Sequence, residues 1–455
     1  MVPVLTVEVI STEELGDRSY VVHDGQSAAV IDPQRDIDRI QETLTRSGLV
    51  CDLVLETHVH NDYVSGGLEL ARRTGARYGV AAVESVQFDR LGISDGDEIP
   101  MGSLRVRAVA TPGHTEGHLS YIVEDTGGDT AVFTGGSLLY GSVGRTDLVD
   151  PSRTEELTRA QYRSVRSLVE RLDDTTPVFP THGFGSFCSS GAAVGGEQAT
   201  VGDERRRNDA LVIDDEDRFV ETLVAGLTAY PSYYVRMAPI NRRGPEPVDL
   251  SMPEPVDGAV LVDRIRAGEW VVDLRTHTAF AAEHLRGSVG VPLGPLLTTY
   301  LGWILPDDAP LTLLGESEDQ VLGAMRQLTR IGIDRPDAAT GVPRTLVPGS
   351  ELGRYPVKTF DDLQLAPDAV VVDVRLDHER RLGFLPGSHH VPLHHLPAHM
   401  GDLPDGQLWV HCAAGYRAAI AASLLDRSGR DVVLIYDALP ADSLAVPAHS
   451  AGLAP

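Results

Sequence analysis

One loop near the end of the chain holds a cysteine in a setting that suits an anion. Cys412 lies between the apolar segment 408–411, an expected strand, and the apolar segment 418–425, an expected helix. Free N–H groups and the dipole at a helix N-terminus stabilise a thiolate or persulfide anion. Gly415 lets the loop curl inward, and Arg417 adds a positive charge. We expect Cys412 and Arg417 to be catalytic and Gly415 to contact substrate, with a buried structural cysteine as the alternative.

A second group of side chains is typical of a metal site. The segment ETHVHNDY follows an apolar strand, and later histidines lie in the segments TPGHTEGH and PTHGFGSFC. Imidazole and carboxylate groups at strand ends suit zinc or iron. The candidate ligands are His58, His60, Asp62, His114 and His182. His182 has an alternative role that it shares with His118, which is to orient a ligand or to contact substrate.

The remaining cysteines and the overall charge limit the class of protein. Three widely spaced cysteines are no disulfide framework and fit a reducing cytosol. Cys51 is expected in the core, and Cys188 is expected to be an ordinary loop thiol that could lie near the metal site. The chain has no secretory leader pattern and no run of about 18 apolar residues. A net charge of −27 disfavours nucleic acid and anionic lipid as partners. We expect a cytoplasmic protein.

The order of expected elements indicates an α/β protein of about three domains. In the first domain, strands and helices alternate in an order that fits an αββα sandwich. A linker rich in proline and charge follows at residues 238–258. The segments 270–294 and 370–394 then repeat one pattern, a strand ending in Asp-x-Arg, a helix, and a turn before Val-Pro-Leu. The expected domains are residues 1–237, 258–345 and 355–450.

The last of these domains resembles the rhodanese superfamily. Asp373 and Arg375 match the Asp-x-Arg of that family, and the loop from Cys412 to Arg417 has the C-x4-R spacing of its sulfurtransferases rather than the C-x5-R spacing of related phosphatases. The resemblance implies a parallel-sheet domain that carries sulfur on Cys412. The repeat at 258–345 resembles the same family but has Gly315 at the cysteine position, followed by acidic residues. We expect it to be a structural or docking partner.

The first domain resembles the metallo-β-lactamase superfamily, and within it the persulfide dioxygenase branch. The resemblance implies a single iron, and Arg145, in the segment GSVGRTDL, is expected to bind substrate. Two positions depart from the pattern of the family: Tyr63 replaces a histidine of the second metal site, and Gly136 replaces an aspartate ligand. We therefore expect one metal on His58, His60 and His114, with Asp62 or water as a further ligand. Restoring the carboxylate at position 136 should tighten binding if the backbone there faces the site.

These expectations lead to an enzyme of persulfide metabolism. Its metal domain, with Fe(II), would oxidise a low-molecular-weight thiol persulfide, and Cys412 would exchange sulfur with thiosulfate, thiols or sulfite. Zinc is the alternative metal, and a metal-free domain is a further alternative. A thioester hydrolase of the glyoxalase II kind needs metal-activated water, which the depleted ligand set disfavours. The third alternative is a binding scaffold with only the rhodanese domain active. A homo-oligomer is left open.

Overall fold

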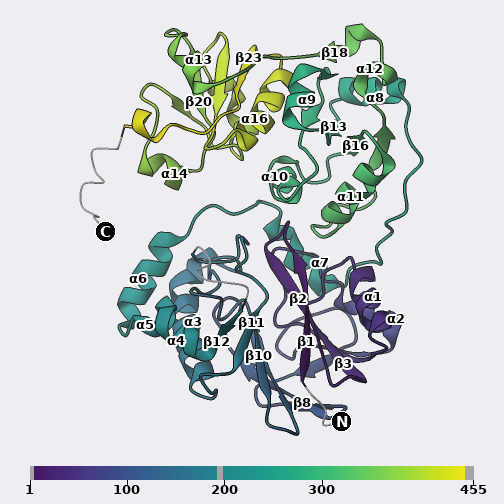
Figure 1. Cartoon of the computed structure of the whole chain (residues 1–455), viewed down its shortest axis with the longest axis vertical. Coiled ribbons are helices and arrows are strands. Elements are labelled where there is room, and N and C mark those ends of the chain that lie inside the picture. The colour runs from purple at the N-terminus through teal and green to yellow at the C-terminus, as the bar shows by residue number, and fades with distance from the viewer. Residues whose placement is uncertain (1–4, 192–197, 446–455) are drawn as a thin grey trace. The chain divides into compact units, whose positions relative to one another are not determined.

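The computed structural model describes residues 5–191 and 198–445 of the chain (Figure 1). The chain forms two compact units, Met1–Asp249 with Leu328–Ile333, and Leu250–Gln327 with Asp334–Pro455. The three domain boundaries expected from the sequence remain predictions. Within the described residues, no helix is long and apolar enough to cross a membrane.

The first unit contains two sheets of six strands each. In the first sheet β1, β2 and β3 are antiparallel, and β3 to β6 are parallel. Its strands, in spatial order, are β1 (Thr6–Thr12), β2 (Asp17–His23), β3 (Ser27–Ile31), β4 (Val50–Leu55), β5 (Arg77–Ala81) and β6 (Leu91–Ile93). The second sheet has the spatial order β12 (Ala199–Thr200), β11 (Pro177–Pro180), β10 (Thr130–Gly135), β9 (Leu119–Asp125), β8 (Leu104–Ala110) and β7 (Glu98–Met101).

Alternating side chains of these strands build three apolar layers. Tyr20 and Val22 of β2 enter the core between the two sheets, whereas Val21 points to the opposite face. The outer face of the first sheet is covered by α1 (Asp38–Arg46) and α2 (Gly67–Thr74). The outer face of the second sheet packs against α3 (Thr154–Val169), α4 (Val201–Arg207), α5 (Asp209–Val212) and α6 (Glu216–Gly226). This confirms the expected αββα sandwich, which α7 (Tyr234–Arg243) follows.

The second unit contains two separate parallel sheets, as expected for two α/β repeats. The sheet of the first repeat has the order β15 (Val289–Gly290), β13 (Trp270–Asp273), β16 (Leu311–Gly315) and β17 (Asp337–Thr340). Its helices are α8 (Gly258–Arg266), α9 (His277–Ala282), α10 (Leu297–Ile304), α11 (Glu318–Thr329) and α12 (Pro343–Leu346). A short antiparallel pair joins β14 (His284–Leu285) to β18 (Leu352–Gly353).

The second repeat has the sheet order β19 (Val357–Lys358), β23 (Val432–Ile435), β22 (Leu408–His411), β20 (Val370–Asp373) and β21 (His389–His390). Its helices are α13 (Phe360–Gln364), α14 (Asp377–Leu382), α15 (Leu396–His399) and α16 (Tyr416–Arg427). The central strands β20, β22 and β23 are apolar along their whole length, as expected for strands of a parallel sheet.

The Asp-x-Arg segment forms the same brace in both repeats. The Arg275 guanidinium donates to both carboxylate oxygens of Asp273 and to the Glu283 carbonyl at 2.7 Å. Arg375 likewise binds Asp373 and donates to the Gly383 carbonyl at 2.8 Å. The brace ties the end of the central strand to the end of the following helix. The sequence repeat therefore corresponds to a structural repeat. We call residues 258–345, which hold no cysteine, the cysteine-free repeat.

Candidate metal centre and cysteine site

Five histidines of the first unit meet at the ends of strands, as the sequence predicts. His58 and His60 follow β4, His114 and His118 lie in the loop between β8 and β9, and His182 follows β11. All five side chains are buried. The ring of His58 lies 4.8 Å from that of His114 and 5.3 Å from that of His182, measured between centroids. The expected convergence is therefore present.

Hydrogen bonds decide which nitrogen each ring turns toward its neighbours. His58 Nδ1 lies 2.9 Å from the Thr57 hydroxyl, which itself donates to Asp32 and therefore accepts from the imidazole. His114 Nδ1 donates to the Arg145 carbonyl at 2.7 Å. With Nδ1 carrying the hydrogen, Nε2 of His58 and Nε2 of His114 are left as lone pairs.

His182 completes this arrangement. Its Nδ1 lies 2.9 Å from Asp17 and 3.2 Å from Asp62, and its Nε2 lies 3.3 Å from Nε2 of His58. Two imidazole nitrogens at this distance share either a proton or a cation. Burial opposes a charge on His182, but Asp62 and Asp17 outweigh it and raise its pKa well above the usual value. The two carboxylates thus favour positive charge here.

His58, His114 and His182 can together hold one metal ion. One ligand atom from each lies within 4.8 Å of the others. His114 Nε2 has no hydrogen-bond partner among the described residues, as expected of a ligand atom. Three imidazoles suit iron or zinc and leave further coordination positions open, and a metal ion would take the place of the proton on His182. The side chains present therefore fit a single-metal centre.

His60, which the sequence placed among the ligands, turns toward carboxylates. Its Nε2 lies 3.2 Å from Glu56 and 3.3 Å from Asp32, and 2.9 Å from the Tyr63 hydroxyl. Although burial opposes protonation, Asp32 and Glu56 raise the pKa of His60 to about 9. Nε2 of His60 therefore faces carboxylate and hydroxyl partners, whereas Nε2 of His114 has none among the described residues. His60 also lies in a group with Asp62 and His182 whose ligand atoms are within 4.8 Å, so its assignment as a ligand stays a prediction.

His118 has both ring nitrogens engaged. Its Nδ1 lies 2.8 Å from the Thr111 hydroxyl, and its Nε2 accepts the Gly136 N–H at 3.0 Å. The ring stacks on His58 with centroids 5.1 Å apart. Whether His118 orients a ligand or contacts substrate stays a prediction.

Gly136 faces the centre, but the space beside it is filled. A Cβ atom at this position would lie 2.2 Å from Cδ2 of the His114 ring. The expectation that a carboxylate restored here tightens metal binding therefore meets a steric obstacle, because the side chain would displace a ligand.

Arg145 is held by the protein rather than presented to solvent. Its guanidinium donates twice to Asp147, at 2.7 and 2.8 Å, and to the carbonyls of Phe187 and Thr228. The side chain is only 2% exposed. Its own carbonyl is the acceptor that orients His114. The structure thus gives Arg145 a positioning role, and its contact with substrate stays a prediction.

Several residues that shape the centre escaped the sequence analysis. Asp32 and Glu56 end the strand segments AAVID and CDLVLE, so the strand-end rule that found the histidines also applies to them. Asn241 of α7 accepts from the Ser65 N–H and donates to the carbonyls of His60 and Tyr63, which fixes the histidine loop. No local pattern marks Asn241, because its partners are far away in the sequence.

Cys188 lies close to the centre, as the sequence analysis allowed. It is fully buried, and burial together with the charges of Asp62 and Asp17 raises its pKa well above the usual value for a thiol. Cys188 is therefore held as a neutral thiol. Cys51 belongs to the apolar layer beneath α1 and α2, as expected.

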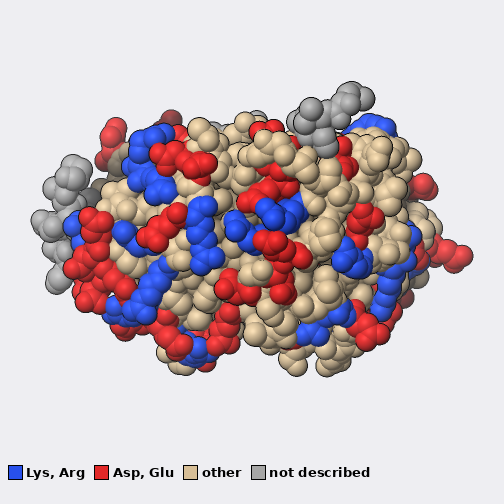
Figure 2. All heavy atoms as spheres, turned by 90° about the horizontal axis from the view of Figure 1, so that it is seen from below, with Lys and Arg blue, Asp and Glu red and all other residues tan. Residues whose placement is uncertain are grey.

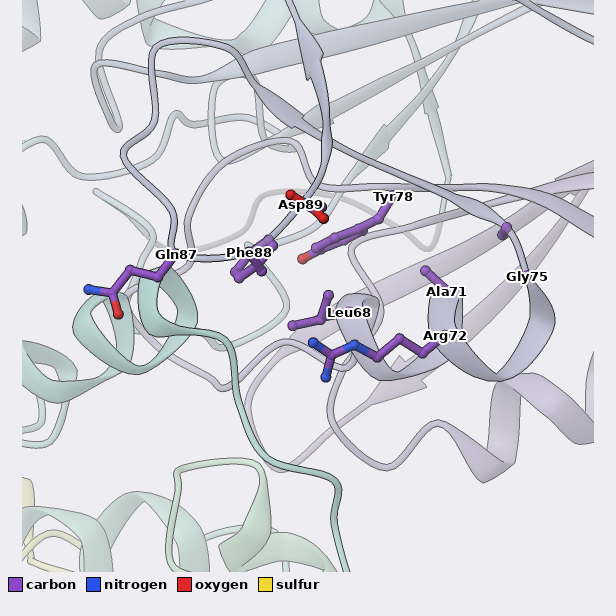
Figure 3. Close-up of a pocket in the computed structure, with 9 residues that line it drawn as sticks. Leu68, Ala71, Arg72, Gly75, Tyr78, Gln87, Phe88 and Asp89 are labelled. Carbon is purple, nitrogen blue, oxygen red and sulfur yellow. The ribbon is translucent and has the colours of Figure 1, made fainter.

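Two cavities lie on either side of one aromatic pair. A surface pocket of about 600 Å³ is bordered by α2 and by the segment 87–89, with Arg72 and Leu68 on its helical side (Figure 3). A smaller cavity of about 10 Å³, room for about one water, adjoins His58, His60 and Glu56. Tyr78 and Phe88, with ring centroids 5.6 Å apart, line both. The aromatic pair therefore belongs to the lining of the surface pocket and to that of the small cavity beside the histidines.

The cysteine of the second unit lies where the sequence predicts. Cys412 follows β22, precedes α16 and is 2% exposed, and its Sγ accepts the Gly415 N–H at 3.1 Å. Gly415 has φ +91°, and a Cβ there would lie 2.6 Å from the Tyr436 ring, so only glycine fits. The Arg417 side chain is bound by both carboxylate oxygens of Glu379. The sequence analysis did not foresee this ion pair.

The equivalent loop of the cysteine-free repeat is closed on itself. Gly315 ends β16, and Gln320 stands five residues later, the spacing that separates Cys412 from Arg417. The Gln320 side chain accepts the Glu316 N–H at 2.7 Å and donates to the Leu274 carbonyl at 3.0 Å. The backbone N–H of Glu316, which could otherwise bind an anion, is thus already hydrogen-bonded to the Gln320 side chain.

The chain thus combines two kinds of domain. The first is an αββα sandwich with a cluster of potential metal ligands, and the last is a parallel-sheet domain with a cysteine at a helix N-terminus. Comparison with known families agrees: residues 15–182 match the metallo-beta-lactamase superfamily, and residues 357–438 match the rhodanese-like domain. The chain therefore carries a metallo-β-lactamase superfamily domain followed by a rhodanese-like domain.

Individual relatives match part of the chain. The mitochondrial persulfide dioxygenase ETHE1 of Homo sapiens is 28% identical over 245 residues, which are 52% of this chain and 80% of that protein. A hydroxyacylglutathione hydrolase of Acidiphilium cryptum (strain JF-5) is 32% identical over 166 residues, 36% of this chain and less than two thirds, 63%, of that protein.

Among solved structures, a metallo-beta-lactamase from Staphylococcus aureus subsp. aureus COL has a TM-score of 0.66 at 23% identity and covers 74% of this chain and 99% of its own. This likeness concerns the fold, and it extends beyond the first unit into the second.

Proposed function

We propose that this chain is an enzyme of sulfur metabolism whose first domain is a one-metal persulfide dioxygenase and whose last domain is a sulfurtransferase. The observation that carries the proposal is the convergence of one imidazole nitrogen each from His58, His114 and His182. Similarity to a protein named persulfide dioxygenase supports the branch. Iron(II) bound there would supply the redox chemistry between O2 and the terminal sulfur of a thiol persulfide. Zinc, the alternative ion, has no redox chemistry and would support only hydrolysis.

The surrounding residues would hold the ligands and exclude water. Thr57 and the Arg145 carbonyl fix the tautomers of two ligands, and Asp17 fixes the third. Complete burial of the histidines keeps bulk water away from the reacting sulfur.

A thioester hydrolase is the second candidate, because of the similarity to a hydroxyacylglutathione hydrolase. A second metal would need His60, and its pairing with Asp32 and Glu56 disfavours that.

The test is anaerobic reconstitution with Fe(II), followed by elemental analysis and by oxygen uptake with glutathione persulfide. We expect about one iron per chain, oxygen uptake, and loss of both in His114→Ala and His182→Ala. His23→Ala, a buried histidine outside the cluster, is the matched control and should retain both. If wild type binds far less than one metal and His114→Ala behaves identically, the first domain has no metal centre. Hydrolysis of a hydroxyacylglutathione without oxygen uptake would favour the hydrolase.

In the last domain, Cys412 would attack sulfane sulfur, with the Gly415 N–H and the α16 N-terminus stabilising the anion. Cys412→Ser should abolish the gain of one sulfur atom by intact mass, whereas Cys51→Ser should retain it.

A further inference from the structure

We propose that Cys412 takes its sulfur from an organic persulfide rather than from thiosulfate, and that Glu379 sets this preference. The inference rests on the proposed sulfurtransferase activity and names the donor. It starts from the ion pair between Glu379 and Arg417, which lies inside the cysteine site.

Sulfur transfer from an organic persulfide and from thiosulfate places different amounts of negative charge in the cysteine site. The Cys412 thiolate attacks the terminal sulfur of a protonated persulfide R–S–S–H, a new S–S bond to Cys412 forms, and the S–S bond of the persulfide breaks. The thiolate R–S⁻ leaves with the electron pair, so one negative charge is present throughout. With thiosulfate the same attack forms Cys–S–S⁻ and releases SO3²⁻, so three negative charges share the site. Thiosulfate therefore needs more positive charge around the sulfur.

Glu379 removes the positive charge that such an anion would use. Burial disfavours charge on either partner, yet the pairing lowers the pKa of Glu379 and raises that of Arg417, so both are ionised. The pair is neutral overall. Nη1 and Nη2 of the Arg417 guanidinium both already donate to the carboxylate oxygens of Glu379. An incoming dianion must compete with a carboxylate already in place.

Two further arginines near the loop share a single carboxylate. Arg375 and Arg380 both bind Asp373, so two positive charges face one negative charge, and both arginines act electrostatically on His411, the neighbour of Cys412. The groups closest to the sulfur of Cys412 are the Gly415 N–H and the N-terminal end of α16. These stabilise one charge on sulfur rather than three.

Aromatic side chains near the cysteine site, which we call the aromatic wall, come partly from the cysteine-free repeat. Tyr300 of α10 lies close enough to Cys412 and Arg417 for their charges to act on its hydroxyl. Its ring centroid lies 5.5 Å from that of Tyr416, which in turn lies 4.6 Å from that of His277 in α9. Burial lowers the pKa of His277 to about 4, so this ring is neutral.

Two polar atoms of this wall are left for a ligand. The Tyr416 hydroxyl and His277 Nε2 are buried, and neither has a hydrogen-bond partner among the described residues. Unpaired buried polar atoms carry a free-energy cost that a bound molecule can relieve. Neutral rings with a few polar atoms suit the organic part of a thiol, whereas they give an inorganic dianion no counter-charge.

The experiment compares the rates at which the full chain is loaded by glutathione persulfide and by thiosulfate, read as the gain of one sulfur atom by intact mass. We expect wild type to load at least about tenfold faster from the persulfide. Glu379→Gln keeps an acceptor for the cap of α14 but removes the charge. It should raise the thiosulfate rate about tenfold and change the persulfide rate less than about twofold. Tyr300→Ala should slow loading from the persulfide alone.

Glu283→Gln is the matched control, because Glu283 pairs with Arg344 elsewhere in the second unit. It should change neither rate. Equal loading of wild type by both donors, or an unchanged donor ratio in Glu379→Gln, would overturn the inference while leaving the sulfurtransferase intact. Loading by neither donor would overturn the proposed activity itself. The ratio of the two loading rates in wild type is measured without any variant. It therefore tests the donor preference even if Glu379→Gln folds poorly.

Discussion

At the scale of single residues, the metal centre depends on partners that no metal motif contains. Thr57, Asp17 and the Arg145 carbonyl set the hydrogen on Nδ1 of the three clustered histidines. The spacing of His58, His114 and His182 at strand ends could be predicted from the sequence. The pairing of His60 could not, because it depends on Asp32, a residue of a neighbouring strand end that only the folded sheet brings near.

Gly136 gives a prediction at this scale. Gly136→Asp should weaken metal binding rather than tighten it, because the new Cβ would lie 2.2 Å from the His114 ring. Overpacking a buried site costs about 1–3 kcal/mol. Fe(II) stoichiometry after reconstitution and the thermal midpoint should both fall. Gly191→Asp is the control, since its nearest neighbour is 3.8 Å away. Tighter Fe(II) binding in Gly136→Asp would contradict this prediction. It would show that the His114 ring moves aside and that the new carboxylate binds the metal.

At the scale of elements, the same strand–loop–helix unit occurs twice in the second unit with opposite chemistry. In one copy the loop amide of Gly415 donates to Cys412. In the other, the Gln320 side chain takes the amide of Glu316. The missing cysteine could be read from the sequence at Gly315. The closure by Gln320 could not, because glutamine at this position has no fixed direction without the structure.

We therefore expect Gly315→Cys, in a Cys412→Ser background, to stay inert as a sulfurtransferase. The new side chain would meet Val321 at 2.9 Å, and the loop amide is already paired. Loading with glutathione persulfide, read by intact mass, is the measurement. Appreciable loading would mean that the loop reopens around a thiolate.

The Asp-x-Arg brace predicts acid sensitivity of the rhodanese-like domain. Burial alone would raise the pKa of Asp373, but Arg375 and His411 outweigh it and lower the pKa from 3.8 to about 2. A lowered pKa contributes stability that is present above about pH 4 and is lost as the pH falls toward 2. The shift corresponds to about 2 kcal/mol.

Asp373→Asn should lose at least this much at neutral pH, and its deficit against wild type should shrink below pH 4. Urea unfolding followed by tryptophan fluorescence is suitable, because all three tryptophans, Trp270, Trp303 and Trp409, lie in the second unit. Asp405→Asn, an exposed aspartate, is the control. If the difference in free energy of unfolding between Asp373→Asn and wild type does not change with pH, Asp373 is not the group whose titration causes the acid sensitivity.

At the scale of the whole molecule, the architecture of each unit could be predicted from the sequence. The order of strands and helices along the chain predicted the sandwich, and the resemblance to rhodaneses implied the parallel sheet. Short strands with no hydrophobic periodicity could not be predicted from the sequence. An example is the antiparallel pairing of β18 with β14. Figure 2 shows acidic and basic side chains mixed on the face in view.

The single lysine of this sequence has a practical consequence. Lys358 lies in β19, its backbone is held by β23, and its side chain is 43% exposed. A protease that cuts only after lysine thus has one target bond in this sequence, and it can act only when β19 leaves the sheet. The cut separates the segment that carries Cys412 from the rest of the chain. Its rate, read on a gel, should report the local opening of that sheet and should fall when a ligand holds the cysteine loop closed.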